Sequence, residues 1–457
     1  MKGNFHNLPI LFNNPKTITT LKILILGSGG REHAYSWKIR QSKLCSELFI
    51  APGNAGTAQL GKNVDIDIND FEAVKKVCLQ NNIDMVVVGP EEPLVNGIYD
   101  FFKSDESLKD IIITGPSRAG AQLEGSKAFA KSFMEKYAIP TAKYKEFDIS
   151  NFDEGLEYIQ HHPLPVVLKA DGLAAGKGVI ICNNHVEALS EFELMIQQSK
   201  FGNAGKKVVV EEFLDGIELS VFVLTDGKNY VILPEAKDYK KIGEGDKGPN
   251  TGGMGAISPV PFATEHFMQK IADRIIEPTI KGLQKEGIDY KGFIFLGLIK
   301  VAEEPMVIEY NCRMGDPETE VVLVRLKNDL VELLVAMDQQ KLGSQEILVE
   351  KNSAVTIVAV SGGYPGSYEK GMPIEFVYLE NPETRKHIDD EGVGALVFHA
   401  GTKKVNDKTV TNGGRVLAVS AMATGLGDAI ELSKTILEEI FFDGMYYRGD
   451  IGYEFVD

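Results

Sequence analysis

Cysteine is scarce in this chain, and its scarcity excludes two kinds of fold. The 457 residues include four cysteines, which are scattered with no C-x-x-C pair: Cys45, Cys78, Cys182 and Cys312. This spacing argues against a zinc knuckle and against a disulfide framework. It is typical of a protein from a reducing compartment, so we expect a cytoplasmic location.

Long hydrophobic runs and an excess of positive charge are also missing. No apolar run approaches the roughly 20 residues that a membrane span needs. The formal net charge is -17, which argues against a general nucleic-acid surface. We therefore expect small-molecule substrates, with neither a membrane nor a nucleic acid as partner, and a monomer as the working assumption. An anionic ligand must be held by a few local cations and backbone N–H groups, because the overall field repels it.

The first recognisable element is a buried-type strand at residues 21–26, followed by a glycine-rich turn and a helical pattern. A glycine-rich turn that opens a helix favours an anion, because its N–H groups and the helix dipole both point at it. A dinucleotide-binding fold, as in an NAD-dependent oxidoreductase, would need a third glycine where this chain has Glu32. The acidic residue expected about 20 positions further on is missing as well. The pattern favours an α/β domain that binds a sugar phosphate.

Three further strands end in loops rich in glycine and proline, at residues 48–51, 85–88 and 111–114. Four such strands predict a parallel sheet with a crevice at its carboxyl edge. Ordinary βα turns explain any one of these loops equally well.

A hairpin with a glycine-rich tip is expected near the middle of the chain. A strand at residues 165–171 leads into residues 172–178 and at once into a second strand. This is no Walker loop, because no Ser or Thr follows Lys177 and the next element is not a helix. The tip is either a mobile flap over phosphates or a plain hairpin.

Two more stretches have a functional and a plain interpretation. Strands at 208–214 and 217–224 suit an adenine connector, with Glu218 accepting from a ribose hydroxyl, or form a hairpin with a polar outer face. Four glycines in residues 248–255 imply a backbone that approaches something closely or moves. A solvated charge run beside a long loop is the alternative. Helices are expected at 122–137 and 327–340.

Residues 307–318 carry the most informative pattern. Their first half predicts a strand, on which Glu309 and Asn311 share a face, together with Arg313. A carboxylate and an amide oxygen suit Mg²⁺ or Mn²⁺ that is held jointly with nucleotide phosphates. Arg313 adds a planar fork for a carboxylate or a phosphate. A strand end with a polar turn would look the same if this stretch stood alone.

Together these stretches resemble the phosphoribosylamine–glycine ligases, also called glycinamide ribonucleotide synthetases, a family of the ATP-grasp superfamily. The resemblance runs from Leu21 to about Tyr453, nearly the whole chain. It rests on residues 27–33, 51–56, 88–91, 169–178, 248–255 and 309–318.

The family resemblance implies a multidomain fold of the α/β and α+β classes. We expect an extension at 1–20, and an open parallel α/β sheet that binds the sugar phosphate at 21–121. A two-part ATP-grasp unit would follow at 122–345, with its flap-bearing subdomain at about 140–205. A mostly β domain would occupy 346–457.

The resemblance also implies the reaction of ATP, glycine and 5-phosphoribosylamine to ADP, phosphate and glycinamide ribonucleotide, in purine biosynthesis, through a glycyl phosphate. Glu309 and Asn311 would hold the metal. The ATP phosphates would lie along Lys127, Lys169 and Lys177, with adenine and ribose at Glu211, Glu212, Phe213, Leu214 and Glu218. Arg313, Lys177 and Asp238 would be catalytic. The substrates would meet Gly29, Gly30, Arg31, Glu32, Asn54, Glu91, Asp238, Lys240, Arg313 and Asp316.

One motif departs from the family pattern. The family often shows Gln-Asp-His before a lysine, where this chain has Lys237, Asp238, Tyr239 and Lys240. Roles for Lys237 and Tyr239 therefore do not carry over. The nearest rival is an ATP-grasp ligase that carboxylates or formylates a purine precursor; the other is a nucleotide-binding module without catalysis.

Residues 1–20 do not resemble a signal peptide, since their apolar stretch is short and broken by Pro9. We interpret them as an extension, disordered or not native, or as a start placed upstream of the real one. An intact mass of the native protein that begins near Leu21 is the expected result. A mass that begins at Met1 would refute the interpretation.

Overall fold

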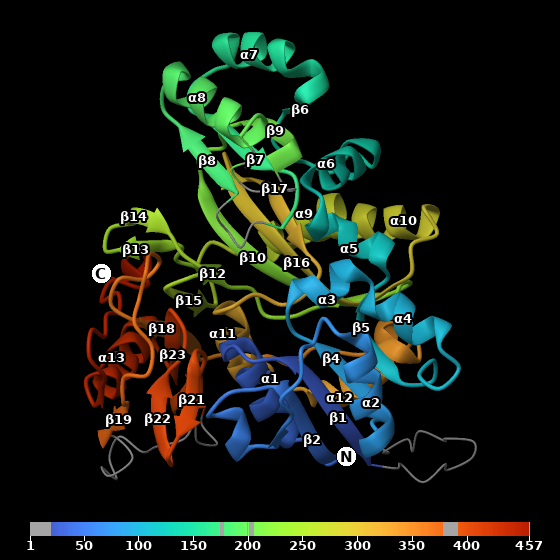
Figure 1. Cartoon of the computed structure of the whole chain (residues 1–457), viewed down its shortest axis with the longest axis vertical. Coiled ribbons are helices and arrows are strands. Elements are labelled where there is room, and N and C mark those ends of the chain that lie inside the picture. Colours follow the sequence, from blue (N-terminus) through green and yellow to red (C-terminus); the bar gives the residue numbers. More distant parts are fainter. Residues whose placement is uncertain (1–19, 174–177, 199, 201–204, 378–391, 457) are drawn as a thin grey trace, which may run out of the picture.

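The computed structural model describes residues 20–173, 178–198, 200, 205–377 and 392–456 (Figure 1). Its N-terminal part is a parallel sheet in the order β5-β4-β1-β2-β3. The strands are β1 (Leu21–Gly27), β2 (Cys45–Pro52), β3 (Lys62–Asn63), β4 (Met85–Val88) and β5 (Ile112–Pro116). The helices are α1 (Gly30–Arg40), α2 (Phe71–Asn81), α3 (Glu91–Asn96), α4 (Ile98–Ser104) and α5 (Arg118–Gly125). The predicted parallel sheet and its glycine-rich carboxyl edge are confirmed.

This sheet continues into the middle of the molecule. β5 pairs antiparallel with β16 (Tyr290–Val301) through Tyr290 and Pro116. β16 then pairs with β10 (Ile217–Thr225) and β17 (Glu304–Asn311), and β10 with β11 (Tyr230–Ile232). The helices α6 (Lys127–Lys136), α9 (Glu265–Ile271) and α10 (Glu277–Lys285) belong to this central part. The shared sheet places the end of β17 next to the glycine-rich edge.

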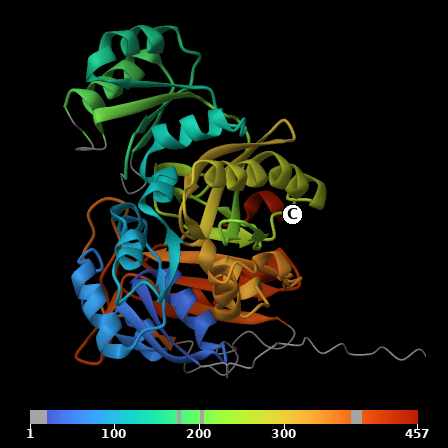
Figure 2. The same ribbon diagram turned by 90° about the vertical axis from the view of Figure 1, so that its right-hand side faces the viewer.

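A separate lobe, which we call the flap lobe, stands at the top of Figures 1 and 2. Its sheet has the order β6-β9-β7-β8, and it has a hydrophobic core of its own. Its elements are β6 (Tyr144–Asp148), α7 (Phe152–His161), β7 (Val166–Ala170), β8 (Val179–Cys182), α8 (His185–Ile196) and β9 (Lys207–Glu212). The predicted hairpin is present as β7 and β8, while its tip at 174–177 lies outside the described residues.

The C-terminal part is rich in strands and lies beside the N-terminal sheet in the lower half of Figure 1. Its main sheet has the order β12-β15-β18-β23-β20 and so takes two strands from the central part. The strands are β12 (Lys237–Asp238), β15 (Gly255–Ser258), β18 (Ser353–Val360), β20 (Gly394–His399) and β23 (Arg415–Ala423). The helices are α11 (Glu318–Arg325), α12 (Leu330–Asp338) and α13 (Leu426–Leu437). Smaller strand pairs are β13 (Lys241–Gly243) with β14 (Lys247–Asn250), β19 (Glu375–Phe376) with β24 (Ile440–Phe441), and β21 (Thr402–Val405) with β22 (Lys408–Thr411).

One predicted element was wrong in detail. The single helix expected at 122–137 is two helices, because Ser126 leaves the helical conformation and caps α6 by accepting from the amide of Phe129. The segment 248–255 begins in the exposed β14 and ends at β15, with a loop at residues 251–254 between them. The close approach predicted for the glycines is present: a Cβ at Gly253 would lie 2.4 Å from Pro317 Cδ.

No helix in the described part of the chain is long and apolar enough to cross a membrane.

Two buried histidines join the N-terminal and C-terminal parts. His33 of α1 accepts a hydrogen bond through Nδ1 from the backbone N–H of His399, at 2.7 Å. Burial lowers the pKa of both side chains, that of His399 to about 4. The hydrogen bond that joins the two parts therefore requires His33 Nδ1 to be unprotonated, so that its lone pair can accept.

These lowered pKa values predict a loss of stability in acid. Between pH 6.5 and about 4 the unfolded chain protonates His399 and the folded chain does not. The free energy of unfolding should therefore fall by about 1.4 kcal/mol per pH unit for this group as the pH drops. Urea unfolding from pH 7 to pH 5 should show a flatter pH dependence for His399→Asn than for the parent. His161→Asn, which changes an exposed histidine of α7, is the control and should leave the slope unchanged; equal slopes for all three proteins would contradict the prediction.

Candidate active site

The end of β17 carries a carboxylate and an amide, Glu309 and Asn311. Asn311 is 8% exposed, and its side-chain nitrogen has no hydrogen-bond partner among the described residues. Glu309 lies across from Gly297 of β16, where a Cβ would come 3.0 Å from Glu309 Cγ. Burial alone would raise the pKa of Glu309, but the charges of four cations hold it below its ordinary value: Lys240, Lys169, Lys127 and Arg313. Glu309 therefore keeps its negative charge although it is buried.

These two side chains fit a hard divalent cation. The ligand atoms would be one charged carboxylate oxygen of Glu309 and the amide oxygen of Asn311. The Asn311 nitrogen, unpartnered among the described residues, is a hydrogen-bond donor and would not bind the cation. In the part of the chain that the structure describes, no three His, Cys, Asp or Glu side chains converge as a metal cage. A cation held here would thus take its remaining ligands from water and from a bound substrate.

Lysines from two segments lie close to Glu309. Lys127, at the start of α6, donates to the carbonyl of Gly172 at 3.1 Å. Lys169 of β7 donates to the carbonyl of Ile308 at 3.2 Å, which ties the flap lobe to β17. Lys177 lies outside the described residues. The structure thus brings two of the three predicted lysines into the electrostatic field of Glu309.

Glu211 shares one oxygen between two lysines. Its Oε2 lies 2.9 Å from Lys169 Nζ and 3.2 Å from the buried Lys131 Nζ, while Oε1 is buried without a partner among the described residues. Burial lowers the pKa of Lys131 to about 8, against the pull of Glu211. Lys131 is a residue that the sequence analysis did not place in the site.

The chain after β9 has backbone groups without a hydrogen-bond partner among the described residues. The backbone of Glu212 pairs with Lys143, but Phe213 and Leu214 make no backbone hydrogen bond within the described segments. Phe213 is exposed at 40%. Free N–H and C=O groups beside an exposed ring suit a planar heterocycle with polar edges.

A second group of charges joins β10, β12 and α11. Lys240 Nζ lies 2.7 Å from Glu218 Oε2, and the acids around it raise its pKa well above the ordinary value, although both side chains of this pair are more than a third exposed. Burial raises the pKa of Asp238, and it raises the pKa of Glu318 to about 7 with help from Asp238. Ser220 donates to Glu318 Oε1 at 3.2 Å. Glu318 was in the predicted motif but had no assigned role.

Arg313 is held by two acids from the N-terminal side. Its Nη2 lies 2.8 Å from Glu124 Oε1 and its Nε 3.4 Å from Glu91 Oε2. The other oxygen of Glu124 accepts from the backbone N–H of Cys312 at 2.8 Å. Glu124 was missed by the sequence analysis, because it stands within an ordinary amphipathic helical pattern.

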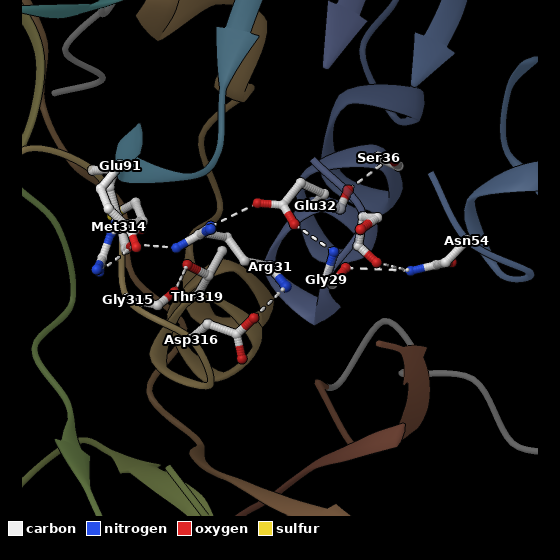
Figure 3. A network of polar contacts seen from close by, with 12 residues as sticks. Gly29, Arg31, Glu32, Ser36, Asn54, Glu91, Met314, Gly315, Asp316 and Thr319 are labelled. Atoms are coloured by element: carbon white, nitrogen blue, oxygen red, sulfur yellow. Dashed lines mark hydrogen bonds and ion pairs between the residues drawn. The ribbon is translucent and has the colours of Figure 1, made fainter. Parts of the chain in front are cut away.

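The glycine-rich turn forms a second, adjoining pocket, drawn in Figure 3. Arg31 donates to Glu32 at 2.7 Å and to the carbonyl of Met314 at 3.1 Å, and its backbone N–H donates to Asp316 at 3.3 Å. The amide of Gly29 donates to Glu32 at 2.6 Å. The Glu32 carboxylate fills space that a side chain at residue 89 would need, since a Cβ there would lie 2.0 Å from its Oε1.

The pocket encloses about 540 Å³ between the N-terminal and C-terminal parts. Asn54 does not line the pocket but holds its glycine-rich turn, since it donates to the carbonyls of Ser28 and His399 at 2.9 and 2.7 Å. Arg415 of β23 does line the pocket, and it lies 3.0 Å from Asp316 Oδ1. Arg415 is a further residue that sequence reasoning missed, since nothing in its local pattern marks it. Gly30 lies against Glu320, whose Oε1 would be 2.2 Å from a Cβ at that position.

Three family models match the chain. Those described as phosphoribosylglycinamide synthetase N domain, ATP-grasp (A) domain and C domain match residues 21–124, 125–319 and 354–454. A phosphoribosylamine–glycine ligase of Clostridium acetobutylicum is 45% identical over 94% of this chain and 99% of its own length. One from Escherichia coli is 43% identical over 96% of this chain and 99% of its own length.

Solved structures agree with these matches. A crystal structure of a phosphoribosylamine–glycine ligase from Thermotoga maritima is 34% identical, with a TM-score of 0.78, over 94% of this chain and all of that one. The biotin carboxylase domain of the Hydrogenobacter thermophilus 2-oxoglutarate carboxylase is 17% identical, with a TM-score of 0.69, over 94% of this chain and 92% of that one. That second likeness shows a shared fold alone.

Two buried carboxyls on separate helices, Glu124 of α5 and Glu320 of α11, predict opposite effects of a Glu→Gln substitution. Glu124→Gln removes the charge that pairs with Arg313, so the free energy of unfolding should fall by about 3 kcal/mol. Glu320 has no hydrogen-bond partner for either oxygen among the described residues, and burial raises its pKa well above the ordinary value.

Glu320→Gln therefore serves as the matched variant. Above pH 4.5 the unfolded parent ionises Glu320 and the folded parent does not, so parent stability declines with rising pH and the Gln variant escapes that decline. Urea unfolding at pH 5 and pH 8 should show a gain for Glu320→Gln that is larger at pH 8. Equal losses in both variants would contradict the two assignments.

Proposed function

This chain belongs to the phosphoribosylglycinamide synthetase family, and on that basis we propose the residue roles that follow. It is an ATP-dependent ligase that forms a carbon–nitrogen bond between glycine and 5-phosphoribosylamine, giving glycinamide ribonucleotide, ADP and phosphate in purine biosynthesis. As an ATP-grasp enzyme it uses ATP and a divalent metal ion.

We propose that Glu309 and Asn311 hold the metal, and that it is Mg²⁺ or Mn²⁺. The observation that carries the proposal is the convergence of Lys127, Lys169 and Lys240 on an ionised Glu309, two residues from the buried amide of Asn311. Such a metal ion would neutralise charge on the phosphates during transfer.

The nucleotide would lie in the cleft between the flap lobe and β17. Lys127 and Lys169 would contact its phosphates, with Lys177 of the flap. The backbone at 212–214 and the unpartnered Oε1 of Glu211 would face adenine, which the free backbone groups there support. Glu218 would accept from the ribose, sharing its carboxylate with Lys240.

The sugar-phosphate substrate would occupy the 540 Å³ pocket, at Gly29, Gly30, Arg31, Glu32, Asn54, Glu91 and Asp316. The turn that opens α1 offers backbone N–H groups to an anion. Arg415 at the rim adds a cation, which supports this placement. Asp238, Lys240 and Arg313 would meet glycine and its activated carboxyl, between this pocket and the metal.

Glycine's carboxylate is a poor acylating agent, so the proposed path goes through glycyl phosphate. The γ-phosphoryl group passes to a carboxylate oxygen, and ADP leaves. The amine of phosphoribosylamine then attacks the acyl carbon, and phosphate leaves with the C–O electron pair and takes up the proton that the amine loses. Arg313 and the lysines hold the reacting charges in place, which is most of what phosphoryl transfer requires. The flap formed by residues 172–178 would close over the acyl phosphate and keep water from it.

Organisation and location complete the proposal. Domain limits at 21–121, 122–345 and 346–457 are supported by the family matches, although two sheets cross them. One chain supplies every residue named, which supports a monomer. The four cysteines are free thiols, which supports a location in the cytoplasm.

A carboxylating or formylating ATP-grasp ligase stays the rival function, and it would not need glycine.

Glu309→Gln should lower ligase turnover by about 10²- to 10³-fold, because the charged ligand is lost while the shape is kept. The measurement is ADP release with MgATP, glycine and fresh phosphoribosylamine, each omitted in turn. Glu303→Gln changes an exposed acid at the other end of the β16–β17 hairpin and is the control. Near-normal turnover of a folded Glu309→Gln protein would reject the assignment, and ADP release without glycine would favour the rival.

A further inference from the structure

The C-terminal segment of the chain reaches back to the strand that carries Asp238. Glu454 Oε1 lies 2.7 Å from Lys237 Nζ, and its Oε2 accepts from the hydroxyl of Tyr239 at 2.6 Å. Lys237 Nζ also lies 3.8 Å from the centre of the Tyr239 ring. Lys237 and Tyr239 are 7% and 1% exposed. One carboxylate from the end of the chain thus satisfies two buried polar groups.

Lys237 and Tyr239 alternate along the chain with Asp238 and Lys240, the two residues that we propose meet glycine. On an extended segment successive side chains point to opposite sides. Lys237 and Tyr239 face Glu454, while Lys240 on the other side reaches Glu218 and lies in the field of Asp238 and Glu309. Any shift of Lys237 and Tyr239 therefore also moves Asp238 and Lys240, which belong to the same stretch of backbone.

The backbone between them is itself fixed at one edge. Tyr239 N–H donates to the carbonyl of Gly255 at 2.9 Å, and its carbonyl accepts from Met254 at 2.7 Å. The side chain of Tyr239 is held separately, because its hydroxyl donates a hydrogen bond to Glu454. Lys237 and Tyr239 are also the two positions at which the sequence departs from the family pattern.

A second set of contacts holds the segment 446–455 in place without Glu454. The fully buried Arg448 pairs with Asp246 at 2.7 Å and with Asp450 at 2.7 Å. Gly449 N–H donates to Glu244 Oε1 at 3.1 Å, next to the β13–β14 hairpin, where the C-terminus lies in Figure 1. Removing Glu454 should therefore leave the segment docked.

We propose that Glu454 is a positioning residue of this ligase: through Lys237 and Tyr239 it fixes Asp238 and Lys240 against glycine and its activated carboxyl. The inference rests on the proposed roles of Asp238 and Lys240. Without the carboxylate, Lys237 is a buried cation with no counter-charge, and the segment must shift to hydrate it. A displacement of about 1 Å is enough to cost orders of magnitude in rate.

The test compares Glu454→Gln with Glu244→Gln, which removes a carboxylate from the same contact surface without touching β12. Glu454→Gln should raise the KM for glycine about tenfold and lower kcat, while the Kd for ADP stays within twofold of the parent value. Glu244→Gln should change none of these by more than twofold. Adding Lys237→Gln to Glu454→Gln should restore part of the loss, because the unpaired ammonium is gone.

Failure of the inference about Glu454 and failure of the proposed roles of Asp238 and Lys240 would give different results. Unchanged glycine kinetics in folded Glu454→Gln, or a loss of stability alone, would overturn the inference. If that variant does not fold, Tyr239→Phe removes only the hydroxyl contact, and an unchanged KM for glycine there overturns it too. Asp238→Asn and Lys240→Gln are measured in parallel. If they leave glycine kinetics unchanged, the proposed function of these residues fails, whatever Glu454 does.

Discussion

The charge on Glu309 depends on cations that three different parts of the chain supply. Burial pushes this carboxyl toward its neutral form, and the lysines push it back. Lys127 comes from α6, Lys169 from the flap lobe, and Lys240 from the segment after β12, whose sheet belongs to the C-terminal part. A chain with a net charge of -17 thus concentrates positive charge around this one carboxyl, where we propose that the anionic nucleotide binds.

The sheets explain how those parts keep their places. β16 pairs with β17 and with β5, so the strand that carries Glu309 and the strands at the glycine-rich edge belong to one sheet. β15 pairs with β18, so the strand with Asp238 is joined to the C-terminal sheet. The flap lobe has a separate sheet and core, and therefore can move against this platform as a unit.

Local patterns were enough to predict the strands at the glycine-rich edge, the β7–β8 hairpin and the strand bearing Glu309. They were not enough for contacts between distant segments. The break at Ser126 depends on its cap, and the partners of Arg313 and Asp316 come from residues far away in the chain. Glu124 and Arg415 stand in ordinary helical and strand patterns, so nothing local marks them. Glu454 likewise acquires its significance only because the fold brings it to β12.

The central claim is that a divalent cation is held between Glu309 and Asn311 together with a nucleotide. Electron paramagnetic resonance of Mn²⁺, titrated into the protein with and without ADP, tests it most directly. The account predicts about one bound Mn²⁺ per chain, tighter with ADP, and at least tenfold weaker binding in Asn311→Leu. Equal Mn²⁺ affinity in the parent and in Asn311→Leu, or no bound Mn²⁺ with ADP present, would contradict it.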